Sequence, residues 1–348
     1  MVAAVKLEQA GIPYLLLEAQ GRFGGRILSQ PVADDAGFGV DLGPTWFWPH
    51  QQRMRRLCAE LECAVFTQHI AGDVLYQQSS KQPVQRSADG QGMLSYRVEG
   101  GTQSLITALA ARLDPAHLQH GSPITRISRG DDGWCVTAGN AAGLPQQVRA
   151  QHLVLAAPPR KLMQIAGLTT CLPAGLPAAL AATPTWMAAQ AKFVAVYPTP
   201  FWRQQGLSGQ VFSRVGPMGE IHDASATADA GFALFGFIGV PAGVRSQHAA
   251  AVLQDACLRQ LVSVFGAQAA MPSVSYIKDW AREPWIVSDL DVGESPMHPE
   301  LDLSPWLPQL HRMQLHFIGS EVAMEEGGYL EGALGSVETF TRTSGLFA

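Results

Sequence analysis

The beginning of the sequence has the pattern of the second half of a βαβ unit. Residues Val2 to Ala10 are rich in Ala and Leu and predict a helix, which Gly11 ends as a residue able to adopt a left-handed conformation. The apolar run Ile12 to Glu18 has the length of a strand, and the Gly-rich segment Gly21 to Arg26 follows it. Because a first strand and a tight turn precede the helix of such a unit, we expect an α/β fold whose first βα unit is truncated.

Glu18 stands where the second strand of this unit ends. In dinucleotide-binding folds a carboxylate at this position accepts hydrogen bonds from ribose hydroxyls, although a glutamate at a strand end is also an ordinary solvated residue. The segment Gly24, Gly25, Arg26 favours the first interpretation. Two glycines let backbone amides approach a pyrophosphate, and an arginine offers a planar pair of donors to phosphate oxygens. We therefore predict that these four residues bind a dinucleotide.

Composition narrows the class of protein further. The chain has 348 residues, of which 47% are hydrophobic and 15% charged, so it can bury a large core. At about 150 residues per domain, this length suggests two domains. The 24 basic residues are balanced by 29 acidic ones and form no dense basic block, so we expect no nucleic-acid partner.

The five cysteines form no CxxC pair, and their odd number does not suggest a disulfide framework. The longest nearly apolar run, Gly231 to Val244, contains Gly and Pro and is shorter than the ~20 residues that cross a bilayer. No charged segment followed by an apolar one marks a signal peptide at Met1. We expect a cytoplasmic protein without a membrane partner.

Eight segments, in the same order along the chain, resemble the flavin-containing amine oxidase family. This family contains the monoamine and polyamine oxidases and shares its FAD-binding fold with related desaturases. The segments are EAQGRFGGR (18–26), DLGPTWFWP (41–49), VEGGTQSL (98–105), SPITRI (122–127), HLVLAAPP (152–159), AKFVAVYPTPFW (191–202), KDWAREPW (278–285) and HFIGSEVAMEEGGYLEGALGS (316–336).

The resemblance implies two domains that are interleaved in sequence. A Rossmann-like FAD-binding domain would comprise residues 1–66, 103–180 and 283–348, and a mixed-sheet α+β substrate domain would comprise residues 67–102 and 181–282. In the family a strand and a GxGxxG turn precede the first helix, inside which Met1 falls here. A misassigned start, a trimmed chain or a decayed gene would each explain this. We expect the chain as written to bind FAD weakly or to be isolated without it.

The resemblance also implies further FAD contacts, and the cofactor is expected to be noncovalent because no cysteine lies between Trp285 and Gly293. Leu330 would offer its backbone amide to the flavin ring at the start of a helix that begins near Tyr329, where the positive end of the helix dipole favours the negative charge of reduced flavin. The other implied contacts are Gly43, Pro44, Thr45, Trp46, Ile124, Gly319, Ser320 and Glu321.

Lys192 is the main candidate for chemistry. In Gln190 to Tyr197 the alternation of a strand puts Lys192 on one face with Val194 and Val196. A lysine on so apolar a strand lies either at an exposed sheet edge or in a polar pocket, and the resemblance favours the pocket. The matching lysine of the family holds a water beside flavin N5 and helps reduced flavin to react with oxygen, because its charge stabilises the negative charge that develops.

Tyr329 matches one wall of the aromatic cage that guides a neutral amine in the family. The second wall normally follows the DW segment, but Val287 to Leu290 contains no aromatic residue. Trp280 or Trp285 would partly replace it, and we name Lys192, Tyr329 and Trp280 as candidate catalytic residues. The sequence contains no HExxH, GxSxG or GxxxxGK[ST] motif, and we expect no metal site.

We therefore predict an FAD-dependent oxidoreductase that oxidises a small-molecule amine to an imine with oxygen as acceptor. Two alternatives remain open at this stage. One is an oxidase or desaturase of the same fold that acts on a different C–H donor. The other is a non-catalytic remnant without flavin. The substrate and the oligomeric state are left open.

Overall fold

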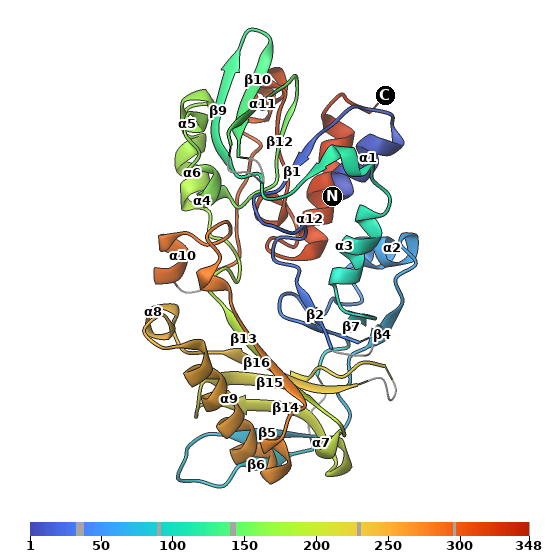
Figure 1. Ribbon diagram of the computed structural model, residues 1–348, viewed down its shortest axis with the longest axis vertical. Coiled ribbons are helices and arrows are strands. Elements are labelled where there is room, and N and C mark those ends of the chain that lie inside the picture. Colours follow the sequence, from blue (N-terminus) through green and yellow to red (C-terminus); the bar gives the residue numbers. More distant parts are fainter. Residues whose placement is uncertain (33–37, 89–91, 140–143, 228–230, 295–296, 348) are drawn as a thin grey trace.

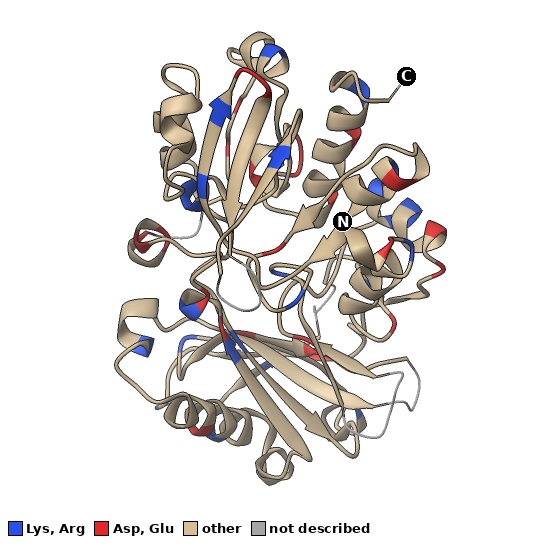
Figure 2. Ribbon diagram, turned by 45° about the horizontal axis from the view of Figure 1, so that its top comes forward, with Lys and Arg blue, Asp and Glu red and all other residues tan. Residues whose placement is uncertain are grey.

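The computed structural model describes residues 1–32, 38–88, 92–139, 144–227, 231–294 and 297–347. Figure 1 shows two lobes along the long axis: an upper lobe, which contains both chain ends, and a lower lobe built on one large sheet. Charged residues of both signs are spread over both lobes (Figure 2). Among the described residues, no helix is long and apolar enough to cross a membrane.

The N-terminal helix and the following strand agree in order with the predicted half of a βαβ unit. Helix α1 spans Val2–Gln9, and Gly11 follows with a φ of 65°. Strand β1 is limited to Leu16–Leu17, because only these residues pair in parallel with β8 (Leu118–Gln119). The strand predicted over Ile12 to Glu18 is therefore correct only at its end.

The rest of the upper lobe consists of small sheets with helices around them. Trp134 lies in a core cluster there, and its indole nitrogen donates to the Met313 carbonyl oxygen. A three-stranded antiparallel sheet contains β9 (Ile124–Gly130), β10 (Gly133–Ala138) and β11 (Gln146–Ala150). Three further sheets have two strands each. They pair β12 (Leu153–Leu155) with β18 (Leu315–Phe317), β2 (Ser29–Pro31) with β3 (Gly39–Asp41), and β4 (Val65–Thr67) with β7 (Tyr96–Val98). The helices are α2 (Gln52–Glu60), α3 (Gln103–Ala110), α4 (Pro159–Leu162), α5 (Leu168–Cys171), α6 (Leu176–Ala182), α11 (Leu307–Met313) and α12 (Leu330–Thr343), with 3₁₀ turns at Pro115–His117 and Ser320–Val322.

The lower lobe is a seven-stranded mixed sheet in the order β17-β13-β16-β15-β14-β5-β6. Only the β14–β5 pair among these strands is parallel. The strands are β5 (Asp73–Gln77), β6 (Gln85–Ser87), β13 (Ala191–Tyr197), β14 (Leu207–Ser213), β15 (Met218–Asp223), β16 (Phe232–Ile238) and β17 (Val274–Asp279). The remaining helices are α7 (Phe201–Gln204), α8 (Ala242–Arg245), α9 (Ala250–Phe265) and α10 (Asp289–Gly293), with 3₁₀ turns at Ala267–Ala270 and Trp280–Arg282.

The two faces of this sheet have different neighbours. Phe193 and Tyr197 of β13 share a core cluster with Leu261 and Phe265 of α9, which covers one face. Val194 and Val196 belong to another cluster with residues of β3, on the face toward the upper lobe. The predicted α/β class and mixed sheet are confirmed, and all seven strands lie within the ranges predicted for the substrate domain. The exact domain boundaries stay a prediction.

Glu331 joins the C-terminal helix α12 to α2. The residue is 2% exposed, and its carboxylate accepts from the backbone amides of Arg53 and Met54 in the first turn of α2. These amides have no partner inside their own helix, so a carboxylate there satisfies them and complements the helix dipole. The contact therefore places the start of α12 relative to α2.

We expect Glu331→Ala to lower the free energy of unfolding by about 1.5–3 kcal/mol, the worth of hydrogen bonds to a charged group. Urea denaturation followed by circular dichroism measures this. Glu338→Ala is the matched control on the same helix, because Glu338 is 50% exposed and pairs with Arg53 and Arg56 at the surface. Its cost should be about 0–1 kcal/mol. Equal costs for the two variants would contradict the assigned role of Glu331.

Candidate functional site

Arg26 brings together segments that are far apart in the sequence. Its guanidinium donates to Ser320 Oγ at 3.0 Å and to Glu321 Oε2 at 2.9 Å, and it lies 2.7 Å from Glu321 Oε1. Gly43 packs against the backbone of Arg26, since a Cβ on Gly43 would lie 2.0 Å from the Arg26 carbonyl oxygen. The predicted FAD contacts at 24–26, 43–46 and 319–321 therefore converge on one region.

The start of α12 lies in the same region. Gly328 N donates to Ser320 O at 3.1 Å, and Gly319 N donates to Ser336 Oγ at 2.8 Å. The helix has Tyr329 as its N-cap residue, and the Tyr329 side chain makes no capping hydrogen bond. The first-turn amides, including that of Leu330, thus form an uncapped positive end that suits an anionic or electron-rich group.

The glycine-rich turn has an open backbone held by a neighbouring arginine. Gly24 and Gly25 have φ values of 116° and 58°, which side chains rarely tolerate. The Arg22 guanidinium donates to the carbonyl oxygens of Gly25 at 2.7 Å and Ile27 at 2.8 Å. The Arg22 side chain therefore stabilises the conformation of the turn, and the two glycines place no side chain over its backbone.

Glu18 lies at the end of β1, beside the segment that leads into β9. Its carboxylate accepts from Gln20 N at 2.8 Å, and its backbone oxygen accepts from Ser122 N at 2.8 Å. Burial raises the pKa of Glu18 above its ordinary value, while the Gln20 amide and the Arg22 charge lower it. Ile124 begins β9 shortly after Ser122 and packs against the upper core, so both predicted contacts lie at one side of the lobe.

Lys192 lies in the interior of the lower sheet. Its strand β13 has β17 on one side and β16 on the other, and the residue is 2% exposed. The ammonium donates to Gly43 O at 3.2 Å and to Thr45 Oγ1, and it lies 4.0 Å from the centre of the Phe235 ring. The alternative of an exposed sheet edge is therefore excluded, and Lys192 faces the DLGPTW segment.

Buried charges surround Lys192. Desolvation lowers the pKa of Lys192 to about 7, Asp41 opposes this shift and Arg97 adds to it. Asp41 Oδ1 accepts from Ser29 Oγ at 2.6 Å and from Thr102 N at 2.8 Å, and the Arg97 guanidinium lies 3.9 Å from Asp41 Oδ2. Sequence reasoning missed both Asp41 and Arg97, although Asp41 is the first residue of the DLGPTW motif.

The segment that Lys192 contacts includes Pro44 and Trp46, and Trp280 supports it from outside. Pro44 O accepts from Thr102 Oγ1 at 3.2 Å, and the Trp46 ring lies 5.4 Å from that of Phe235. The Trp280 indole nitrogen donates to Leu42 O at 2.8 Å, and the residue is 4% exposed. Trp280 therefore packs against Leu42, just before the residues that Lys192 contacts.

The aromatic neighbours of Tyr329 differ from those expected. They are His298 at 5.0 Å, Trp48 at 5.4 Å and Trp186 at 6.5 Å between ring centres. The expectation that Trp280 or Trp285 would face Tyr329 is thus corrected, because Trp280 is buried against residue 42 and Trp285 is 42% exposed. Trp186 and His298 follow no local pattern that could have pointed to them.

His298 holds the Tyr329 hydroxyl. Its Nδ1 lies 3.0 Å from Gly327 O and its Nε2 lies 3.3 Å from the Tyr329 hydroxyl. Because a carbonyl oxygen only accepts, Nδ1 donates to Gly327 O, and Nε2 forms the hydrogen bond with the Tyr329 hydroxyl. The His298 imidazole stacks on the Trp186 ring, with 3.6 Å between the ring centres. Gly328 packs against Trp186, since a Cβ on Gly328 would lie 2.7 Å from Trp186 Cβ.

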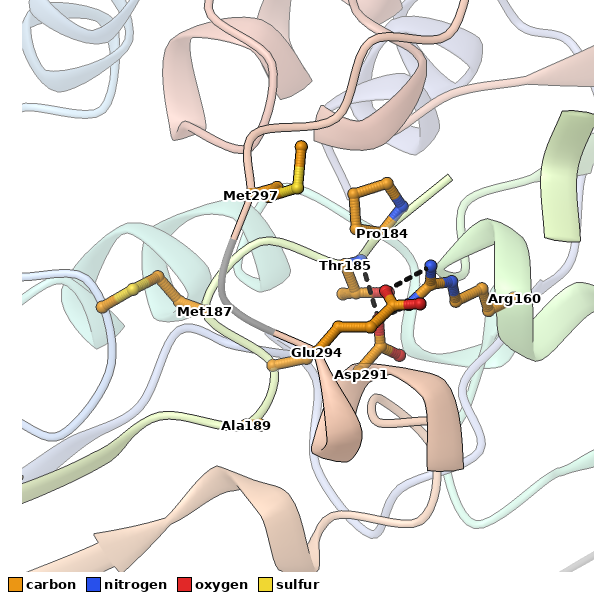
Figure 3. Close-up of a pocket in the computed structure, with 9 residues that line it drawn as sticks. Arg160, Pro184, Thr185, Met187, Ala189, Asp291, Glu294 and Met297 are labelled. Carbon is orange, nitrogen blue, oxygen red and sulfur yellow. Dashed lines mark hydrogen bonds and ion pairs between the residues drawn. The ribbon is translucent and has the colours of Figure 1, made fainter. Parts of the chain in front are cut away.

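A buried ion-pair network holds the loop that carries Trp186 (Figure 3). Asp291 Oδ1 accepts from Arg160 Nη1 at 2.7 Å and from Thr185 N at 3.0 Å, and Arg160 Nη2 donates to Glu294 at 2.8 Å. Beside these groups is a cavity of about 10 Å³, the size of one water molecule. Arg26 completes the support, since it donates to the Trp186 carbonyl oxygen at 3.0 Å.

Known proteins resemble this chain along most of its length. A protein from Dictyostelium discoideum described as a probable flavin-containing monoamine oxidase A is 23% identical, over 96% of this chain and 92% of its own length. A putative flavin-containing monoamine oxidase from Mycobacterium tuberculosis and a putrescine oxidase from Kocuria rosea are 30% and 28% identical over 69% and 70% of this chain. The matches span only 50% and 51% of those two proteins.

Solved structures share the fold. Cyclohexylamine oxidase from Brevibacterium oxydans superimposes with a TM-score of 0.80 at 20% identity, over 97% of this chain and 94% of its own. Wild-type putrescine oxidase bound to putrescine superimposes with a TM-score of 0.75 at 19% identity, over 98% and 95%. The family model for flavin containing amine oxidoreductase matches residues 1–88 and 66–337. The chain therefore belongs to the flavin-containing amine oxidoreductases, a family of FAD-dependent oxidoreductases.

Proposed function

We propose that the protein oxidises a small-molecule amine to an imine and passes the electrons to oxygen. The observation that carries this proposal is the lysine at position 192, buried in an otherwise apolar strand with its ammonium on Gly43 and Thr45. Burying a cation costs free energy, and ionisable groups with strongly perturbed pKa values concentrate at functional sites. The family membership and the relatives named for amine oxidation support the choice of substrate class.

The described residues fit FAD. The Glu18 carboxylate would hold the ribose, and the open glycine backbone beside Arg26 would admit the pyrophosphate. The uncapped start of α12 would meet the flavin ring with the Leu330 amide. Ser320 and Glu321, which pair with Arg26, would lie along the ribityl chain. When bound, FAD supplies the two-electron acceptor that the reaction needs.

Lys192 would act through its charge. In a desolvated site a fixed cation stabilises negative charge strongly, including the charge that oxygen acquires when it accepts an electron. Because burial lowers the pKa of Lys192 to about 7, the side chain can exist with and without its proton near neutral pH. It can therefore also exchange a proton with a water or a substrate nitrogen.

Tyr329, Trp186 and His298 would orient the amine. Their rings present flat apolar and polarisable faces beside the start of α12. Tyr329 cannot turn freely, because its hydroxyl forms a hydrogen bond with His298 and Trp186 covers Gly328. We also propose that the chain forms the two interleaved domains whose ranges are given above. A second proposal is that the protein works in a reducing compartment, which its five free cysteines support.

A test of this function starts with an absorption spectrum of the FAD-loaded protein. Addition of primary and secondary amines under oxygen should then release hydrogen peroxide in amounts equal to the carbonyl product. Bleaching of the flavin by an alcohol or another C–H donor, with none by amines, would favour a different oxidase of this fold. Failure to bind FAD at all would favour the non-catalytic alternative.

Lys192→Met should slow reoxidation of the flavin by oxygen by roughly 10²-fold, the scale of one preorganised electrostatic contact, and change anaerobic reduction by an amine much less. Stopped-flow absorbance separates the two half-reactions. Lys278→Met is the control, because Lys278 lies beside Lys192 on the neighbouring strand β17. It should leave both rates near those of the wild type. Unchanged reoxidation in Lys192→Met would show that the charge is not used.

Glu18→Ala should weaken FAD binding by about 1.5–3 kcal/mol, because a charged hydrogen bond to the ribose is lost while the fold remains. Titration of the flavin-free protein with FAD, followed by tryptophan fluorescence, measures the affinity. Glu60→Ala, on the exposed side of α2, serves as the control. An unchanged affinity in Glu18→Ala would remove Glu18 from the binding site.

The buried lysine should also make stability depend on pH. The pKa of Lys192 is about 7 in the folded protein and 10.5 in an unfolded chain, so between these values the unfolded state binds the extra proton. Raising the pH from 7 to 10.5 therefore stabilises the folded state relative to the unfolded one. This stabilisation is complete above 10.5 and is lost as the pH falls through 7. The free energy of unfolding of the wild type minus that of Lys192→Met should therefore rise from pH 7 to pH 10 in urea titrations without FAD. A constant difference would place the lysine in solvent.

A further inference from the structure

Two histidines of the upper lobe form a contact that the proposed reaction does not use. His152 directly precedes β12, and His316 lies in β18, the strand that pairs with β12. Nδ1 of His152 lies 3.1 Å from Nε2 of His316, the ring centres are 5.4 Å apart, and the ring planes differ by 7°. The two distances differ by about one ring diameter, so both nitrogens lie close to the line between the ring centres. This is the geometry of a linear N–H···N hydrogen bond.

The contact limits the charge that the two rings can carry. In an N–H···N hydrogen bond one ring donates, and the other accepts through a lone pair. The accepting ring is neutral, because a charged imidazole has a proton on both nitrogens. The pair therefore holds at most one positive charge while the contact exists, and a second proton would leave two donors facing each other.

The surroundings of His316 oppose a second proton. The residue is 6% exposed. On α11 it faces His311, with 6.5 Å between the ring centres, and on α12 it faces Phe340, with 5.1 Å between the ring centres. Burial, followed by the charges of His152 and His311, lowers the pKa of His316 to about 4. Burial also lowers the pKa of His152.

The acidic residues of the neighbouring helices are engaged elsewhere. Glu331 and Glu338 of α12 both pair with Arg53 on α2. The other charged residues of α11 and α12 are Arg312 and Arg342, which are basic. A second charge on the histidine pair thus meets positive or apolar neighbours from both helices.

Strand β18 leads directly into a segment of the candidate site. After His316, Ile318 N donates to Leu155 O at 2.9 Å, and Gly319 N donates to Ser336 Oγ at 2.8 Å. Residues 319–321 follow, and they include the carboxylate that pairs with Arg26. A displacement of β18 from β12 would therefore move the segment that Arg26 binds.

We propose that His152 and His316 form an acid-sensitive switch that controls the order of residues 315–321. His152 is partly exposed, so a proton can reach the pair from solvent. A second proton breaks the hydrogen bond, the like charges separate β18 from β12, and residues 319–321 lose their fixed position. This segment lies along FAD if the proposed function holds, and acid then weakens the binding of the cofactor.

The direction of the pH dependence follows from the two states of the pair. The pKa of His316 is about 4 in the closed pair and returns toward its ordinary value of 6.5 when the strand opens. Between these values the open form binds the proton that the closed form excludes. The closed form is thus fully favoured above pH 6.5 and is lost as the pH falls toward 4.

Hydrogen exchange of the full chain without FAD, followed by mass spectrometry, tests the proposal. After correction for intrinsic exchange rates, the amides of residues 315–321 in the wild type should exchange at least about tenfold faster at pH 5 than at pH 7.5. His316→Gln should change less than about threefold over this range, because the glutamine oxygen accepts from a protonated His152 and the contact survives in acid.

Two further variants keep the result interpretable. His152→Asn changes the partly exposed partner and should likewise reduce the acid response, so it decides the question if thermal unfolding shows that His316→Gln is not folded. His248→Gln replaces an exposed histidine after α8 and should keep the response of the wild type. Exchange that does not accelerate in the wild type at pH 5, or an undiminished response in His152→Asn and His316→Gln, would overturn the proposal.

Titration with FAD at the same two pH values tests the consequence for the cofactor. The loss of FAD affinity between pH 7.5 and pH 5 should be about tenfold larger in the wild type than in His316→Gln. Equal losses would overturn the link between the switch and the cofactor. Absence of FAD binding at both pH values would count against the proposed function instead, because the exchange measurement contains no FAD and decides the switch independently.

Discussion

Arg26 reaches from the glycine-rich turn to three partners from later parts of the chain: the Glu321 carboxylate, the Ser320 hydroxyl and the Trp186 carbonyl oxygen. Glu321 is 4% exposed, so its charge has to be matched inside the protein. Satisfying that carboxylate forces the turn, the 3₁₀ turn before α12 and the Trp186 loop into one place. The start of α12 and the aromatic cluster then follow, because both are attached to these segments.

The same site contains a second buried charge that is only partly compensated. Lys192 rests on one carbonyl and one hydroxyl, with the Phe235 ring beneath it, while Asp41 directs one oxygen to Ser29 and Thr102 and the other toward Arg97. A protein that needed only stability would gain by replacing such groups with apolar ones. Their presence beside the DLGPTW segment is consistent with a function that depends on a tunable positive charge.

Tyr329 acquires its neighbours from three separate regions, and the Arg160–Asp291 pair sets one of them in place. Asp291 accepts from the backbone amide of Ser288, the N-cap residue of α10, and also from the Thr185 amide, so one carboxylate fixes both the start of this helix and the loop leading to Trp186. The His298 ring then lies between Trp186 and the Tyr329 hydroxyl. The shape of the proposed amine path therefore depends on residues distant from the reacting groups.

Local features of the fold followed from the sequence. Helix α1 and the start of α12 near Tyr329 were predicted, because glycines and periodicity act between near neighbours. The ordered motifs indicated the family. The sheet face that Lys192 shares with Val194 and Val196 followed from simple alternation along β13.

Only the tertiary structure decided what these elements contact. Lys192 is interior because β16 and β17 pair with its strand on the two sides. The aromatic neighbours of Tyr329 include Trp186 and His298, which come from distant parts of the chain. Such contacts arise from the burial of charge and apolar surface between distant segments. Interactions of this kind produce no periodic pattern in a sequence.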